Sequence, residues 1–91
     1  MEPTEVFRFR DGVRFFDFEE SSFVIDISNQ SLYNLGKSSS LIAASINGRN
    51  DVSKVVQVIM EHYDVSREDS VNAVIRFVAM MQENGLVEKI A

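Results

Sequence analysis

The sequence predicts an α+β fold, in which an N-terminal antiparallel sheet of three to four strands is followed by three helices. Short apolar runs separated by polar turns fill roughly the first third of the 91-residue chain, as expected for short strands. Apolar residues then recur at helical spacing in the later segments. These later segments also begin and end at residues that commonly cap helices, such as Ser66 and Gly85.

The composition fits a single domain over residues 1–91 and excludes several classes of site. No Pro/Gly/Ser-rich linker divides the chain, and 45% hydrophobic residues with seven Phe suffice for one core. With no cysteine and one histidine, the chain offers no disulfide, thiolate site or histidine pair, so we expect neither metal nor cofactor. No apolar run approaches the roughly 18 residues of a membrane span, and the N-terminus lacks a signal-peptide core, so we expect a cytoplasmic protein without a membrane partner.

The first 18 residues are predicted to form a hairpin. Strands are expected near 6–10 and 13–18, separated by Asp11-Gly12, a strong signal for a two-residue turn. We expect the arginines of these strands to lie on a solvated strand face and not to bind phosphate.

Two further strands are predicted to extend this sheet as a meander. A polar turn at 19–22 leads into the β-branched and aromatic run 23–27, and a second polar turn at 28–31 leads into 32–35. Consecutive short strands joined by tight turns favour antiparallel pairing.

The last of these strands, 32–35, passes through Gly36-Lys37 directly into a helix. One side of this strand is therefore free, and we interpret it as an edge that binds a peptide. Alternation along the strand predicts that Tyr33 and Leu35 face the core, which leaves Leu32 and Asn34 on the other face. A register shifted by one residue would exchange the two faces.

The first two helices are marked by their caps. Helix one is expected to begin with Ser38 as N-cap and to end at Asn47-Gly48, a left-handed stop. Helix two follows a polar cap at Asn50-Asp51 and carries one apolar stripe. The members of this stripe are Val52, Val55, Val56, Ile59, Met60 and Tyr63.

Helix three is predicted from the cap Ser66 to Asn84-Gly85, with Leu86 folding back onto its end before a short closing segment. Its apolar arc exceeds the roughly 100° that a surface helix needs, so it is either buried on two sides or offers a second face to a partner. The methionines at 80 and 81 either fill the core or adapt to a ligand. The arc comprises Val71, Ala73, Val74, Ile75, Phe77, Val78, Ala79, Met80 and Met81.

The sequence contains no recognisable catalytic set, so we do not expect an enzyme. Ser40 would need a base, and His62 is the only candidate. The serine run at 38–40 lacks the Gly-rich approach of a phosphate loop. The carboxylates of Asp17 and Asp26 are expected to be solvated.

The order of strands and helices is also that of a winged helix-turn-helix, which makes a DNA-binding or regulatory protein the alternative function. The net charge of −5 disfavours DNA, because neutralising phosphates supplies most of the affinity. Helix three would bring Glu68, Asp69 and Glu83 towards phosphate, against only Arg67 and Arg76. A purely structural assembly subunit is a third possibility.

Five segments follow one another along the chain and read FVIDI, LYNL, SSSLIAASING, HYDVSREDSVNAV and FVAMMQENGLV. In this order they resemble the PqqD-like family, the recognition elements for ribosomally made precursor peptides (RiPPs). The resemblance covers about residues 13–88. Like typical members, the chain closes helix three with Gly85-Leu86 followed by a hydrophobic residue, here Val87.

This resemblance implies a non-catalytic domain that binds the leader of a precursor peptide as a further strand on the 32–35 edge, in a cleft against helix three. It also implies delivery of the peptide to a maturation enzyme, either a leader peptidase and cyclase, as for lasso peptides, or a radical SAM protein, as in pyrroloquinoline quinone synthesis. The peptide-binding residues implied are Ser31, Leu32, Tyr33, Asn34, Leu35, Ser70, Ala73, Val74, Phe77 and Met80.

Two positions depart from the family pattern. Members often carry Asn where this chain has Gly36, and many carry Asp where it has Ala73. If that Asp contacts the peptide in relatives, a polar contact is missing here, and the preferred peptide sequence is expected to differ.

Overall fold

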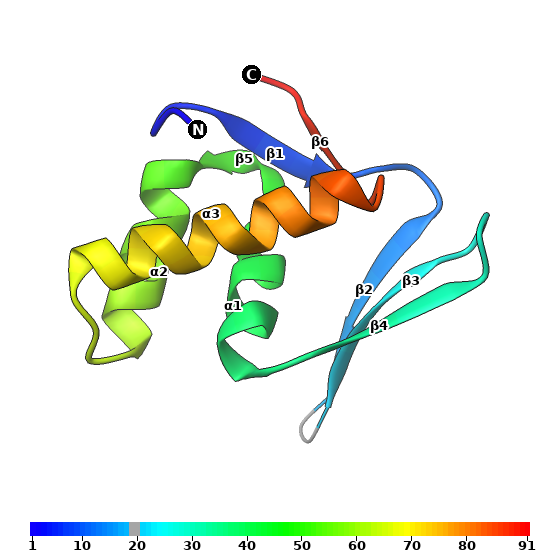
Figure 1. Cartoon of the computed structure of the whole chain (residues 1–91), viewed down its shortest axis with the longest axis horizontal. Helices are drawn as coiled ribbons and strands as arrows, with labels where there is room; N and C mark the ends of the chain where they lie inside the picture. The colour runs from blue at the N-terminus through cyan, green and yellow to red at the C-terminus, as the bar shows by residue number, and fades with distance from the viewer. Residues whose placement is uncertain (19–20) are drawn as a thin grey trace.

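A computed structural model describes residues 1–18 and 21–91 and confirms the α+β class, with antiparallel strands and three helices (Figure 1). Glu19 and Glu20, part of the polar turn predicted at 19–22, lie outside the described residues. The elements are β1 (Val6–Phe9), β2 (Val13–Asp17), β3 (Ser22–Asp26), β4 (Ser31–Leu35), α1 (Lys37–Ser45), β5 (Asn47–Asp51), α2 (Val52–His62), α3 (Arg67–Glu83) and β6 (Val87–Lys89).

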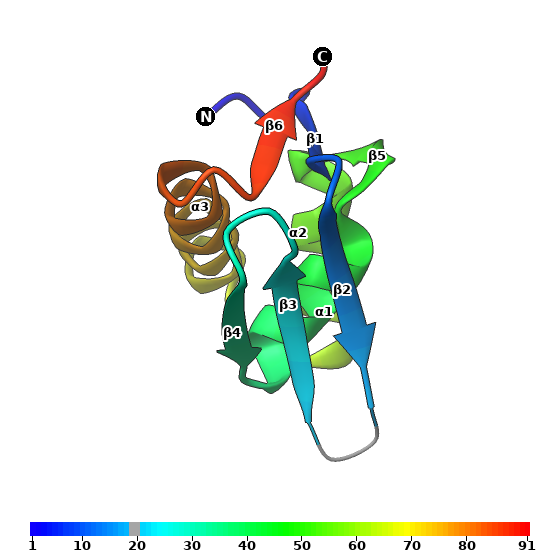
Figure 2. The ribbon, with the colours of Figure 1, turned by 90° about the vertical axis from the view of Figure 1, so that its right-hand side faces the viewer.

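The meander is confirmed for β2, β3 and β4, which form an antiparallel sheet in that order. Val24 at the centre of β3 pairs with Phe15 of β2 and Tyr33 of β4. Figure 2 shows β4 at the edge of this sheet, on the side where α3 lies. The expectation that the last strand forms an edge is therefore confirmed.

The hairpin predicted for the first 18 residues is wrong. β1 pairs with β5 and β6 in a separate three-stranded sheet, in the order β5-β1-β6. Gly12 does adopt the positive φ of +85° that a tight turn requires, but the turn carries the chain from one sheet into the other. The physical reason is tertiary, because two segments that follow much later in the chain occupy both edges of β1 and help bury Phe7.

The start and end of α1 differ from the prediction. The helix begins at Lys37 with Gly36 as N-cap, and no side chain caps it. Ser38 is already inside the helix, because the backbone of Gly36 is extended and its carbonyl accepts the N–H of Ser40 at 2.9 Å. Gly48 has the expected positive φ, +79°, yet it lies within β5, which the sequence analysis did not foresee.

The caps predicted for the other two helices are confirmed. Asp51 accepts the N–H of Lys54 at 2.8 Å, and Ser66 accepts the N–H of Asp69 at 3.1 Å.

At the end of α3, Gly85 adopts a φ of +69° and donates its N–H to Gln82 O, while Leu86 donates to Met81 O at 2.8 Å. This paired pattern is a Schellman motif, and it turns Leu86 back into the core as predicted.

One hydrophobic core joins the helices to both sheets. Its most deeply buried side chains come from β3, all three helices and the segment after α3: Val24, Ile42, Val56, Val74, Val78, Met81 and Leu86. Within the described part of the chain, none of the helices combines the length and apolarity that crossing a bilayer requires.

Two ion pairs lie at the surface beside the β5-β1-β6 sheet. Arg8 Nε lies 2.8 Å from Glu88 Oε1, and Lys89 Nζ lies 3.6 Å from Glu5 Oε2. A hydrogen bond from the Glu2 backbone N–H lowers the pKa of Glu5, and Lys89 adds to this effect. The prediction of a solvated strand face is thus confirmed for Arg8, whose exposed pair contributes little to stability.

The prediction that Asp26 is solvated is wrong, because this carboxylate pairs with Arg10 in an interaction between β3 and the end of α3. Asp26 lies on the core face of β3 with only 1% of its surface exposed. Its Oδ2 lies 3.6 Å from Arg10 Nη2 and accepts a hydrogen bond from Asn29, while its Oδ1 has no partner among the described residues. Arg10 Nε donates to the carbonyl of Gly85, and its backbone N–H donates to Leu86 O.

We predict that Arg10→Met lowers the free energy of unfolding by about 1–3 kcal/mol, because it leaves a buried carboxylate without its charged partner. The double variant Arg10→Met/Asp26→Asn should recover part of this loss, since it removes the buried charge. Urea unfolding of the three proteins measures both values. A double variant less stable than Arg10→Met would contradict the pairing.

Candidate functional site

The backbone of β4 has a defined free side, which follows from the ladder between β2 and β3. Phe18 and Ser21 exchange both of their backbone hydrogen bonds, and Ile27 donates to Gly12 O at 2.9 Å. Bonded and non-bonded pairs alternate in an antiparallel ladder, so Phe23 and Ile25 direct their backbone groups towards β2. Ser22, Val24 and Asp26, which alternate with them, direct theirs towards β4.

The same alternation continues into β4. Ser31, Tyr33 and Leu35 lie opposite the β3 residues that face β4, so their backbone groups are bonded within the sheet. Leu32 and Asn34 therefore direct their N–H and C=O groups away from the sheet, at its free edge. These groups can pair with an added strand.

The side chains of β4 divide between its two faces as predicted. Tyr33 and Leu35 pack against the core, whereas Asn34 is exposed and Leu32 has 55% of its surface exposed. Leu32 continues an apolar outer face that the sequence analysis did not single out. The rings of Phe16 and Phe23 on this face lie 5.4 Å apart.

Beyond the end of β4, two adjoining hollows of about 400 Å³ and 260 Å³ separate the first turn of α1 from α3. Ser38 and Ala73 border both hollows, so together they form one groove, which we call the α1–α3 groove. Its remaining lining residues are Lys37, Ser39, Ile42, Ile59, Tyr63, Val65, Asp69, Ser70, Arg76, Phe77 and Met80.

Four of the five candidate residues on α3 line this groove. Ser70 is buried and donates its hydroxyl to Val56 O at 3.0 Å, while Ala73 is half-buried. Phe77 is buried beneath the smaller hollow, whereas Met80 has 44% of its surface exposed. Val74 differs from them, because it has no exposed surface and supports the groove from the core.

Sequence reasoning missed the α1 side of the groove. Lys37 and Ser38 directly follow the edge strand, and this adjacency was the available signal. Tyr63 and Val65 also line the groove, but the sequence marks them only as a break between helices. Their role depends on how α1 and α2 pack, which no local pattern reveals.

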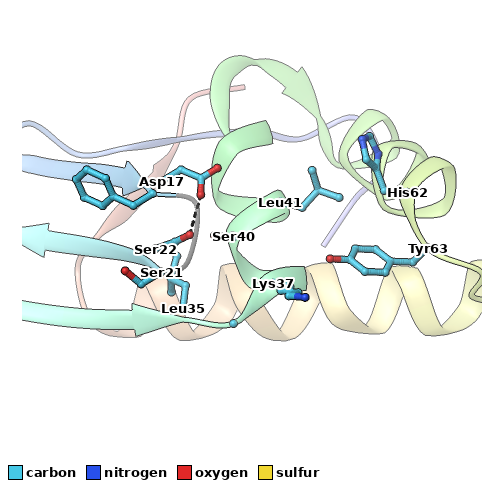
Figure 3. Close-up of a pocket in the computed structure, with 11 residues that line it drawn as sticks. Asp17, Ser21, Ser22, Leu35, Lys37, Ser40, Leu41, His62 and Tyr63 are labelled. Carbon is cyan, nitrogen blue, oxygen red and sulfur yellow. Dashed lines mark hydrogen bonds between the residues drawn. The ribbon is translucent and has the colours of Figure 1, made fainter.

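A third hollow of about 680 Å³, the α1–α2 hollow, lies between the ends of β2 and β3, the first turn of α1 and the end of α2 (Figure 3). Ser40 and His62 both line it, but the structure records no hydrogen bond between them. His62 Nδ1 instead lies 2.9 Å from Val58 O. Asp17 also lines this hollow, and its carboxylate accepts a hydrogen bond from the hydroxyl of Ser22 at 2.9 Å.

No group of three or more His, Asp or Glu side chains that could hold a metal ion occurs among residues 1–18 and 21–91. The described site thus offers an unpaired strand edge beside an apolar groove with a few polar groups.

Comparison with protein families gives one match that bears on this site. The family described as coenzyme PQQ synthesis protein D (PqqD) matches residues 22–87, which include the edge strand, the groove and all three helices. Comparison with curated proteins gives no significant match.

Two solved structures share the fold. One, a lasso peptide synthetase B1 complexed with the leader peptide, has a TM-score of 0.80 and 21% identity, over 90% of this chain and 96% of that one. The other, TbiB1 in complex with the TbiA(beta) leader peptide, has a TM-score of 0.82 and 17% identity, over 92% and 98% of the two chains.

We predict that amide hydrogen exchange distinguishes neighbouring residues of β4 in the free protein. The amides of Leu32 and Asn34 should exchange rapidly, whereas that of Tyr33 should be protected, because only the latter is bonded to β3. Exchange followed by NMR measures each amide separately. Equal protection of all three would show that this edge is already covered.

Proposed function

Because the chain belongs to the PqqD family, we propose that it is a non-catalytic protein that recognises the leader of a ribosomally made precursor peptide. The observation that carries this proposal is the free edge of β4, which leads directly into the α1–α3 groove. Two proteins of the same fold form complexes with leader peptides, which supports a similar ligand here.

The proposed complex combines two kinds of contact. The leader pairs its backbone with Leu32 and Asn34, which supplies affinity independent of sequence. Its side chains then enter the α1–α3 groove, where Ala73, Phe77 and Met80 offer an apolar surface that supplies specificity. Tyr33, Leu35, Ser70 and Val74 hold these two walls in position from the core, and Ser31 begins the strand.

We propose that the chain presents its bound peptide to a maturation enzyme, either a leader peptidase and cyclase or a radical SAM protein. Both similar structures are leader-peptide complexes, and one is described as a lasso peptide synthetase B1, which favours the lasso-type partner. We place this function in the cytoplasm, where ribosomes make the precursor.

No observation favours DNA binding, the alternative from sequence. The first turn of α3 carries Glu68 and Asp69, whose charges oppose phosphate. The helix also buries a full stripe against the core, so that stripe is unavailable to a DNA groove.

We predict that a leader peptide encoded by a neighbouring short precursor gene shifts the amide resonances of Leu32, Asn34 and the α3 residues that line the groove. The shifts arise because a new strand pairs at the edge while side chains fill the groove. NMR titration of the labelled protein measures these shifts. The resonances of β1, which belongs to the other sheet, serve as an internal control. Unchanged resonances at high micromolar peptide would refute edge binding.

We predict that Leu32→Pro weakens peptide binding at least about tenfold, because proline removes an outward N–H and distorts the edge. Leu32→Ala is the matched control, since it shortens the same side chain and keeps the N–H. Calorimetric titration measures binding, and thermal unfolding checks the fold. Binding and stability lost together in Leu32→Pro would indicate that this N–H is bonded within the sheet.

A further inference from the structure

The N-terminus of α1 lacks the side-chain cap that the other two helices have. Asp51 and Ser66 cap α2 and α3, but α1 follows Gly36, which has no side chain to offer. The first intrahelical bond of α1 runs from Ser40 N–H to Gly36 O. The N–H groups of Lys37, Ser38 and Ser39 precede it and have no acceptor within the helix.

All three hollows meet at this uncapped end. Lys37 borders both the α1–α2 hollow and the larger part of the α1–α3 groove, and Ser38 borders both parts of that groove. Gly36 itself lines the α1–α2 hollow. Lys37 and Tyr63 also line this hollow, and in Figure 3 the hydroxyl of Tyr63 is directed towards α1. The N-terminal turn of α1 therefore borders all three hollows.

The charges around this end favour an anion, although the whole chain carries a net charge of −5. Two cations, Lys37 and Arg76, line the α1–α3 groove against one carboxylate, Asp69. In the α1–α2 hollow, the Lys37 ammonium is accompanied by one carboxylate, that of Asp17, which already accepts a hydrogen bond. The positive end of the helix dipole adds to this local charge.

A second observation points to a missing ligand. Ser40, in the first turn of the same helix, is 9% exposed, and its Oγ is buried with no hydrogen-bond partner among the described residues. Nearly all buried hydroxyls have a partner, so an unpaired one beside a hollow calls for an explanation. Gly36, Lys37 and Ser40 line the same α1–α2 hollow, so a ligand acceptor held there at the N-terminus of α1 would provide one.

We propose that the N-terminus of α1 binds the side-chain carboxylate of an Asp or Glu in the precursor peptide, an inference that rests on the proposed function. A strand paired with Leu32 and Asn34 and extended past Leu35 advances about 3.3 Å per residue, so it reaches α1 within a few residues. There the amides of Lys37 and its neighbours, together with the Lys37 ammonium, receive the carboxylate. The acid lies on the part of the peptide that extends past Leu35.

Gly36 allows this site to be closed without disturbing the fold. Its φ of −77° suits any residue, and a Cβ placed there has no heavy atom within 4 Å. Gly36→Asp supplies a carboxylate from within the chain, which occupies the free amides as an ordinary N-cap. Gly36→Ala is the matched control, because it adds the Cβ and leaves the amides free.

The test is selection from a displayed library of random peptides of roughly 12 residues, long enough at about 3.3 Å per residue to cover the edge and the groove. Selection on the unaltered protein and on Gly36→Ala should enrich peptides that carry apolar anchor residues and an Asp or Glu at a constant spacing from those anchors. Gly36→Asp should retain the anchors and lose the acid. Replacing that acid by its amide should weaken binding to the unaltered protein about threefold to tenfold and leave binding to Gly36→Asp unchanged.

The other outcomes distinguish a failure of the carboxylate site from a failure of the proposed leader recognition. Enriched peptides without a positioned acid would overturn the carboxylate site and leave leader recognition standing. An acid preference that persists in Gly36→Asp would place the acid elsewhere and overturn the site as well. Failure to enrich any peptide would overturn both the proposed function and the inference.

Discussion

Arg10 connects the sheet that carries the β4 edge to the end of α3. Its side chain donates to the carbonyl of Gly85 at the end of α3 and lies beside Asp26 at the end of β3, while its backbone donates to Leu86. β4 is bonded to β3, so this interaction holds the edge strand and α3 in one frame. Because Asp26 is buried, the charge pair also penalises arrangements in which the sheet and α3 separate.

In this arrangement, the exposed edge of β4 is available to pair with a peptide. Proteins usually protect such edges because they invite aggregation, yet Leu32 and Asn34 direct unpaired backbone groups outward. The α1–α3 groove begins where β4 ends, so a peptide that pairs with the edge also meets side chains. Backbone pairing alone would accept any extended chain, and the groove adds the discrimination that a recognition protein needs.

Much of the fold follows from local patterns. The caps Asp51 and Ser66, the Gly85-Leu86 helix stop and the alternation of β4 are predictable, because each depends on a few adjacent residues and their own hydrogen bonds. Long-range pairing is not predictable in this way. Asp11-Gly12 is a good turn signal, but its conformation is equally compatible with a hairpin and with a crossing between sheets, and only the late strands β5 and β6 decide between them.

The same distinction between local and long-range features applies to the candidate site. By itself the sequence determined that a short edge strand enters a helix and that α3 carries an unusually wide apolar arc. The tertiary structure alone decided which part of that arc remains accessible, since adjacent Met80 and Met81 end on opposite sides, one exposed and one buried. It also decided that the N-terminus of α1 lacks a side-chain cap and borders three hollows. The lining of these hollows comes from segments far apart in the chain.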